Sequence, residues 1–159
     1  MEFGKFSKIA ASILICHFAG LIGSVATYPY ITTWYASLQK PFFNPPNWLF
    51  GPAWLILYTL MGISLYLVWE KGLKNKEVKR SVVVFGVQLA LNSLWSVLFF
   101  GLKNLMLAFI EIIALWAFIA ISIVSFYKIS KKAALLLVPY ILWVSFAALL
   151  NYSVWMLNM

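Results

Sequence analysis

Five long apolar segments limit what this chain of 159 residues can fold into. They cover about residues 7–28, 46–69, 79–100, 104–127 and 133–156. A spanning α-helix needs about 20 mainly apolar residues, so each segment is long enough to cross a bilayer. The runs are continuously apolar and longer than the strands of a membrane barrel. The sequence therefore predicts an all-α integral membrane protein, a five-transmembrane-helix bundle.

The composition excludes a water-soluble globule. Apolar residues make up 64% of the chain and charged residues only 10%. So few charges cannot cover the surface of a soluble domain of this size. Because the five segments and their short connections account for the chain, we expect a single membrane domain over residues 1–159.

The basic residues predict the orientation of the bundle in the membrane. A net charge of +8 suggests nucleic acid in a soluble protein, but these residues form no patch interleaved with aromatics, so no nucleic-acid partner is expected. Ten of the twelve fall on one side of the alternating connections: Lys5, Lys8, Lys71, Lys74, Lys76, Lys79, Arg80, Lys128, Lys131 and Lys132. The other side has only Lys40 and Lys103. The positive-inside rule places the N-terminus in the cytoplasm and the C-terminus outside.

The first segment has an alternative interpretation. Its basic start, its apolar run and the small residues Ser24, Val25 and Ala26 resemble a signal peptide with a cleavage site. The apolar run is at the long end for such a peptide, so a first membrane helix is preferred.

The first connection, about residues 29–45, is unusually aromatic for a simple loop. Its side chains are too apolar to extend into water, so we expect it to fold back over the end of the bundle as a lid. Asn44, followed by two prolines, is typical of a helix N-cap.

Metal and hydrolytic sites are not expected. The chain has no Asp, one His and one Cys, so neither a ligand cluster nor a catalytic triad can be assembled, and no cofactor is implied. Cys16 is interpreted as a packing residue. His17 is expected to hydrogen-bond to a neighbouring helix, or alternatively to serve as a ligand contact or axial base for a haem-like macrocycle. Glu111 is expected to face the bundle, either in a structural hydrogen bond or in a substrate or proton role.

Two helices carry inward stripes at a spacing of four residues. Gln88, Asn92 and Ser96 form the first, and Trp143, Ala147 and Asn151 form the second. Aromatic walls, a small residue and amides are typical of an apolar small-molecule site. Amides that only join helices would give the same pattern. Small-residue pairs at Gly20 and Gly23, and at Gly86 and Ala90, indicate close helix approach or a dimer face.

The sequence resembles the TspO/MBR family, also called translocator protein, tryptophan-rich sensory protein or peripheral benzodiazepine receptor. The matching segments, in chain order, are residues 34–41 (WYASLQKP) with Pro45 and Pro46, Trp54 with residues 57–58 and 61–62, residues 88–92 with Trp95 and residues 99–101, residues 139–140 with Trp143, and residues 150–152 with Trp155. The resemblance implies a pocket that opens toward the first loop and binds porphyrins such as protoporphyrin IX, benzodiazepine-type ligands and, in many members, sterols. It also implies a homodimer, as is usual in bacterial members, and a prokaryotic cell membrane, and it retains the first helix.

The resemblance carries eight pocket positions to this chain: Trp34, Pro45, Trp54, Asn92, Trp95, Trp143, Ala147 and Leu150. Tyr58, Gln88 and Asn151 complete the predicted ligand-binding set. The predicted function is a membrane translocator or sensory protein for tetrapyrrole transport or regulation. The alternative is a light- and oxygen-dependent porphyrin-degrading enzyme that uses Trp34 and Tyr152.

Two departures from the family pattern affect the expected ligands. The sterol-recognition pattern of animal members needs a basic residue soon after Tyr152, and residues 153–159 supply none, so sterol binding is doubtful. Some members carry a further Trp where Leu107 stands, which is expected to alter drug affinity.

Overall fold

The computed structural model describes residues 2–159, with side chains from Gly4 onward, and every regular element in that range is helical. The long helices are α1 (Glu2–Thr27), α3 (Asn47–Trp69), α4 (Lys76–Ser96), α5 (Leu105–Ile129) and α7 (Val138–Leu157). The short elements are η1 (Tyr28–Tyr30), α2 (Trp34–Ser37), the π-helical turn η2 (Val97–Gly101) and α6 (Lys131–Leu136). Five stretches are long and apolar enough to cross a membrane. The predicted all-α bundle of five such helices is confirmed.

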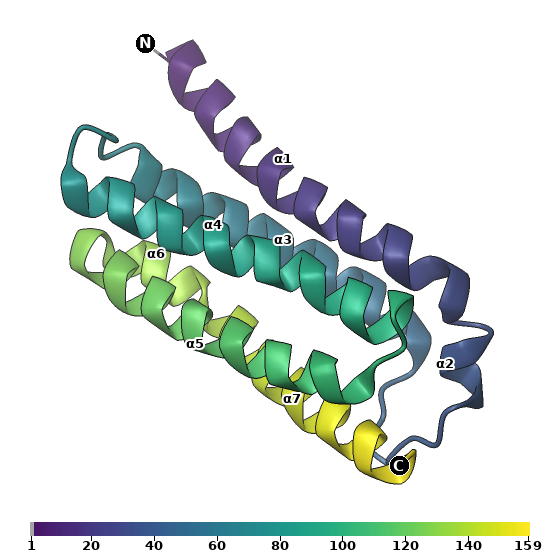
Figure 1. Ribbon diagram of the computed structural model, residues 1–159. Coiled ribbons are helices and arrows are strands. Elements are labelled where there is room, and N and C mark those ends of the chain that lie inside the picture. Colours follow the sequence, from purple (N-terminus) through teal and green to yellow (C-terminus); the bar gives the residue numbers. More distant parts are fainter. Residues whose placement is uncertain (1) are drawn as a thin grey trace.

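Each long helix packs closely against at least one other, but α3 and α7 have few contacts with each other. Helix α1 lies beside α3 and α4, α4 lies beside α5, and α5 lies beside α7 (Figure 1). Helix α3 packs along α6 but meets α7 at few positions. The backbones of α3 and α7 are therefore apart along most of their length, and aromatic side chains bridge them at Trp54 and Trp143.

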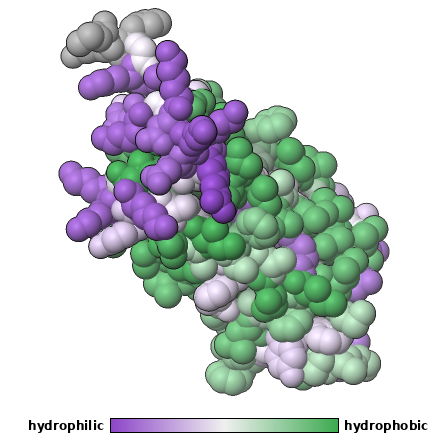
Figure 2. Space-filling model, turned by 60° about the vertical axis from the view of Figure 1, so that its left-hand side comes forward, coloured by the Kyte–Doolittle hydropathy of each residue, from purple (hydrophilic) through white to green (hydrophobic). Residues whose placement is uncertain are grey.

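The two ends of the bundle differ in polarity. We call the end formed by the start of α1, the α3–α4 connection and the α5–α6 junction the basic end, because ten of the twelve basic residues lie there. Hydrophilic side chains gather at this end, while the rest of the visible face is largely hydrophobic (Figure 2). We call the opposite end, with η1, α2, the connection to α3, η2 and the C-terminus, the lid end.

Three helix boundaries differ from those predicted. Helix α1 begins at Glu2 rather than near residue 7, so its first turns carry charge. Helix α4 begins at Lys76 rather than at residue 79, because the Asn75 side chain accepts a hydrogen bond from the Glu77 amide at 2.9 Å. The last span is divided into α6 and α7 at Leu137, two residues before Pro139, which has no amide hydrogen to continue the helix.

The end of α4 is a π-helical turn, which the sequence did not predict. The Leu102 amide donates to the Val97 carbonyl at 2.8 Å, five residues back. Phe99 and Phe100, although consecutive, are both buried. The wider turn thus presents two neighbouring phenylalanine rings to the lid.

Glycines allow α1 to approach α3 and α4 closely, as predicted for Gly20 and Gly23. A Cβ atom on Gly20 would overlap the Tyr58 ring, and one on Gly23 would lie 3.0 Å from Ser96 Oγ. The closest backbone approach is at Gly62 of α3, where a Cβ atom would lie 2.5 Å from Ile13 Cα. Gly86 differs, because a Cβ atom there would meet nothing within 4 Å. The pair at Gly86 and Ala90 therefore does not bring helices of this chain together.

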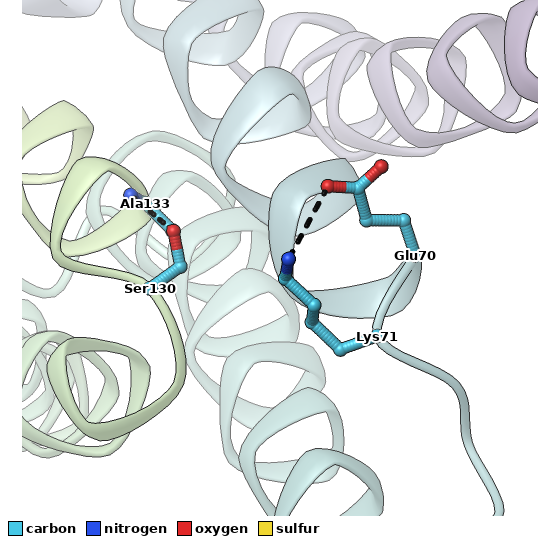
Figure 3. A network of polar contacts seen from close by, with 4 residues as sticks. All are labelled: Glu70, Lys71, Ser130 and Ala133. Atoms are coloured by element: carbon cyan, nitrogen blue, oxygen red, sulfur yellow. Dashed lines mark hydrogen bonds and ion pairs between the residues drawn. The ribbon is translucent and has the colours of Figure 1, made fainter.

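Polar contacts at the basic end shape the connections (Figure 3). Ser130 accepts a hydrogen bond from the Ala133 amide at 3.3 Å and so caps α6. Glu70 and Lys71 form an ion pair at 3.9 Å. Because both side chains are partly exposed and adjacent in sequence, this pair adds little to stability.

Replacing Ser130 with alanine is expected to lower the free energy of unfolding by about 1 kcal/mol, because the first turn of α6 loses its cap. Reversible unfolding in mixed micelles measures the change. Ser7→Ala is the matched control, since the exposed Ser7 hydroxyl bonds only to the Gly4 carbonyl within its own helix. Equal effects of the two substitutions would contradict the capping role.

Candidate ligand-binding pocket

A cavity of about 1160 Å³ lies under the lid between α1, α3, α4, α5 and α7. Eight of the eleven residues predicted to bind a ligand line it: Trp54, Tyr58, Asn92, Trp95, Trp143, Ala147, Leu150 and Asn151. No Lys, Arg, Asp or Glu is among the described residues that line the cavity. Drug-sized ligands occupy pockets of about 300–1,000 Å³, so this one has room for a large apolar molecule.

The walls of the cavity are mainly aromatic. Trp54 stacks on Tyr58 with ring centroids 5.3 Å apart, and its edge faces Trp143 at 6.5 Å. On the opposite helix, Trp95 stacks on Phe99 at 4.9 Å. These rings hold one another in fixed orientations, and such pairs add about 0.5–1.5 kcal/mol beyond their buried area. The cavity therefore has flat, preformed walls.

Asn92 and Asn151, the two predicted amides that line the cavity, also join helices. The Tyr58 hydroxyl donates to Asn92 Oδ1, and Asn92 Nδ2 donates to the Tyr140 hydroxyl at 3.0 Å, which connects α3, α4 and α7. Trp95 Nε1 donates to Asn151 Oδ1 at 3.0 Å, and Asn151 Nδ2 donates to the Leu105 carbonyl at 3.0 Å. The amides therefore join helices, as the second interpretation of the polar stripes predicted, and they also line the cavity. The amides stabilise the bundle and leave little hydrogen-bonding capacity for a ligand.

The lid folds over the end of the bundle as predicted. Tyr35 is buried, lines the cavity and donates its hydroxyl to Asn44 Oδ1 at 2.9 Å. Burial raises the pKa of the Tyr35 phenol, and the hydrogen bond with Asn44 opposes this rise. Gln39 and Asn158 exchange two hydrogen bonds of 3.0 and 2.9 Å, which fasten the lid to the end of α7. The lid is thus anchored at both the aromatic core and the C-terminus.

Asn44 is not the helix cap that the sequence predicted. Its oxygen accepts from Tyr35, and its amide nitrogen donates to the Pro45 carbonyl at 3.0 Å. Helix α3 begins after Pro46, which adopts an extended conformation. Hydrogen bonds to Tyr35 and Pro45 within the lid thus engage the Asn44 side chain in place of a helix cap.

The other predicted site residues do not line the cavity. Trp34 packs edge-on against Phe99 and Phe100 within the lid, and Pro45 precedes α3. Gln88 is fully buried in the bundle, where its amide has no hydrogen-bond partner among the described residues. Tyr152 is 44% exposed on α7 and contacts Phe109. Neither residue assigned to the enzymatic alternative therefore borders the cavity.

Helix α1 forms a wall of the cavity that sequence reasoning missed. Its contribution extends from Leu14 to Thr27 and includes His17, Gly20 and Gly23. The spacing of the two glycines was visible in the sequence, but it predicted only close helix approach. His17 makes the predicted interhelical hydrogen bond, with its Nε2 atom 3.1 Å from Thr59 Oγ1 of α3.

Glu111 faces the bundle but does not make the expected structural hydrogen bond. It is 7% exposed, and neither carboxyl oxygen has a partner among the described residues. Its neighbour Ile112 lines the cavity, so the carboxyl group lies just behind the wall that α5 provides.

Replacing Glu111 with methionine is expected to raise the free energy of unfolding by about 1–2 kcal/mol, because a buried polar group without a partner is removed. Asn151→Leu is the matched contrast and should lower it by about 1–3 kcal/mol, since it leaves Trp95 Nε1 without its acceptor. Unfolding in mixed micelles measures both. A loss of stability in the Glu111 variant would contradict the assignment of an unpaired carboxyl group.

Known proteins resemble this chain over most of its length. The sequence profile of the TspO/MBR family matches residues 12–156. Tryptophan-rich protein TspO of Archaeoglobus fulgidus is 50% identical over 151 residues, which cover 95% of this chain and 97% of that protein. Tryptophan-rich protein TspO of Chlorobaculum tepidum is 43% identical over 150 residues, covering 94% and 95%. Translocator protein of Homo sapiens is 42% identical over 124 residues, covering 77% and 73%.

Proposed function

Because the chain belongs to the TspO/MBR family, we propose that this multi-pass membrane protein binds a porphyrin in the cavity under the lid and serves in tetrapyrrole transport or sensing. One observation carries the proposal: the cavity is large, its walls are flat aromatic rings, and none of its described lining residues is charged. A planar, largely apolar macrocycle fits such walls by stacking and van der Waals contact. Benzodiazepine-type ligands are bound by the same apolar surfaces.

The charges around the lid end support an anionic amphiphile as the ligand. Lys40 and Lys103 are the basic residues of that end, and no Asp or Glu occurs in residues 28–46 or 97–104. Lys40 Nζ lies 4.7 Å above the Tyr35 ring, and Lys103 Nζ lies 4.8 Å above the Tyr30 ring. A macrocycle within the cavity could therefore direct its carboxylates toward a positively charged rim.

A titration with protoporphyrin IX in detergent tests the proposal. Porphyrin absorbance should change saturably on adding the protein, and Trp143→Phe should weaken binding because the indole forms part of a wall. Trp34→Phe is the matched control, since Trp34 does not line the cavity and its loss should leave binding in the dark unchanged. Absence of a saturable change would overturn the proposal.

Illumination distinguishes the enzymatic alternative. In oxygenated buffer under light, a binding protein should leave the porphyrin spectrum as stable as free porphyrin in micelles. Accelerated bleaching that Trp34→Phe or Tyr152→Phe abolishes would favour the porphyrin-degrading enzyme instead.

The predicted orientation can be tested with introduced cysteines, because the native Cys16 is fully buried. A membrane-impermeant maleimide applied to intact cells should label Ser37→Cys at the lid end. Lys74→Cys at the basic end should react only after the cells are opened. The reverse labelling pattern would contradict a cytoplasmic N-terminus.

The homodimer remains part of the proposal. Gly86 and Ala90 are exposed on α4, and a Cβ atom on Gly86 would meet nothing within 4 Å among the described residues. A face with small residues permits close approach of a second copy. Cross-linking of Ala90→Cys in membranes is expected to yield a covalent dimer.

A further inference from the structure

His17 gives the apolar cavity a single imidazole. It lies on α1, is partly buried, and borders the cavity near the end of the α1 wall that is farther from the lid. The Tyr58 ring lies 6.0 Å away, between centroids, and that ring stacks on Trp54. The imidazole is thus placed beside the stacked rings of Tyr58 and Trp54.

The hydrogen bonds around Thr59 fix which imidazole nitrogen carries the proton. The Thr59 hydroxyl donates its only hydrogen to the Leu55 carbonyl at 2.8 Å. Toward His17 it can therefore only accept, so Nε2 must be the donor across the 3.1 Å contact. In the neutral imidazole this leaves Nδ1 without a proton and with a free lone pair. No partner for Nδ1 occurs among the side chains that the structure describes.

The other polar groups deep in the cavity are already engaged. Asn92 bonds to Tyr58 and Tyr140, and Asn151 bonds to Trp95 and the Leu105 carbonyl. The lone pair of His17 Nδ1 is therefore the strongest uncommitted base at the cavity wall. An imidazole nitrogen is among the commonest protein ligands for iron and zinc.

The Thr59 contact also matches what a metal-binding imidazole requires. A histidine that binds a metal through one nitrogen nearly always donates its other N–H to a fixed acceptor, which sets the ring orientation and raises the basicity of the ligating atom. Here Thr59, held by the Leu55 carbonyl, is that acceptor. No second protein ligand is needed when a macrocycle already holds the metal at its centre.

We propose that His17 Nδ1 is the axial ligand for the metal of a metallated tetrapyrrole, with Thr59 as the residue that positions the imidazole. The Nδ1 lone pair forms the bond to the metal, and a water molecule leaves the same axial position. Nε2 keeps its proton, and neither the metal nor the protein changes oxidation state. This inference rests on the proposed porphyrin binding, which it deepens by selecting metallated over metal-free macrocycles.

The test compares three probes, namely Fe(III)-, Zn(II)- and metal-free protoporphyrin IX, titrated into the full-length protein in detergent. Wild type should shift the Soret band of both metallated probes to the position of an imidazole-ligated complex. His17→Phe should abolish that shift and weaken metallated binding on the order of 10- to 100-fold, while metal-free binding changes less than about twofold. Thr59→Val should weaken metallated binding by about tenfold and leave metal-free binding unchanged.

A rescue experiment separates ligation from packing. Imidazole added to His17→Gly should restore the ligated Soret position, because the small base can occupy the vacated space. The matched control is Ile22→Ala, an exposed residue of the same helix that does not line the cavity and should change no titration. Unchanged thermal unfolding of each variant establishes that the bundle is intact.

The outcomes distinguish this inference from the function on which it rests. If no probe binds wild type, porphyrin binding itself fails. If the metal-free probe binds but His17→Phe leaves the metallated spectra unchanged, axial ligation is overturned and porphyrin binding stands. If His17→Phe weakens all three probes equally, His17 only shapes the wall, and axial ligation is again overturned.

Discussion

Gly62→Ala is expected to destabilise the bundle by about 2–3 kcal/mol or to prevent its accumulation in the membrane. The added methyl group would lie 2.5 Å from Ile13 Cα, and a backbone atom cannot move aside by changing rotamer. Helices α1 and α3 would have to separate, and overpacking of this kind costs about 1–3 kcal/mol, occasionally more. The free energy of unfolding in mixed micelles and the yield of folded protein measure the effect.

Gly51→Ala is the matched control, since it makes the same chemical change in the same helix. A Cβ atom on Gly51 would meet nothing within 4 Å. Alanine favours a helix over glycine by about 1 kcal/mol, so this variant should be as stable as wild type or more stable. Equal destabilisation by the two variants would contradict the close contact of α1 with α3.

Ala147→Phe is expected to weaken porphyrin binding at least about tenfold while the bundle stays folded. Ala147 lines the cavity on α7, between Trp143 and Asn151, so a benzyl group there would occupy the ligand's space. Because that space is open, the larger side chain should not strain the helices. Titration with protoporphyrin IX gives the affinity, and thermal unfolding reports on the fold.

Leu149→Phe serves as the control for Ala147→Phe. Leu149 is 55% exposed on the same helix and does not line the cavity. Its replacement adds an aromatic ring to the outer face and should leave the affinity unchanged. Undiminished binding by Ala147→Phe would show that the ligand occupies another site.

The sequence predicted the membrane helices because the length of an apolar run is a local property. It did not predict the π-turn at residues 97–101 or the division of the last span at Leu137. The π-turn depends on packing of Phe99 and Phe100 against the lid, which involves residues far along the chain. Pro139 did not predict the division, because a proline that begins a new helix cannot be distinguished in a single sequence from a proline within a continuous membrane helix.

The candidate site was predicted in part. A spacing of four residues correctly placed Asn92 and Asn151 on inward faces. It also placed Gln88 on an inward face, but it could not show that Gln88 is buried in the bundle beyond the cavity. Periodicity reports which side of a helix faces inward and not how far along the helix a cavity extends. The α1 wall was missed because small residues such as Gly20 and Gly23 signal proximity without indicating what lies next to them.

The loose contact between α3 and α7 makes any occupant of the cavity part of the protein's structural support. A bound macrocycle would add contacts between α3 and α7 to the aromatic pair that Trp54 and Trp143 already form. Since such a ligand binds the folded bundle and not the unfolded chain, it adds RT ln(1 + [L]/Kd) to the free energy of unfolding, about 2.7 kcal/mol at one hundred times Kd. The resistance of the protein to heat and proteases would then increase with the concentration of its ligand. The amount of the protein in the membrane would in turn depend on how much ligand the cell contains.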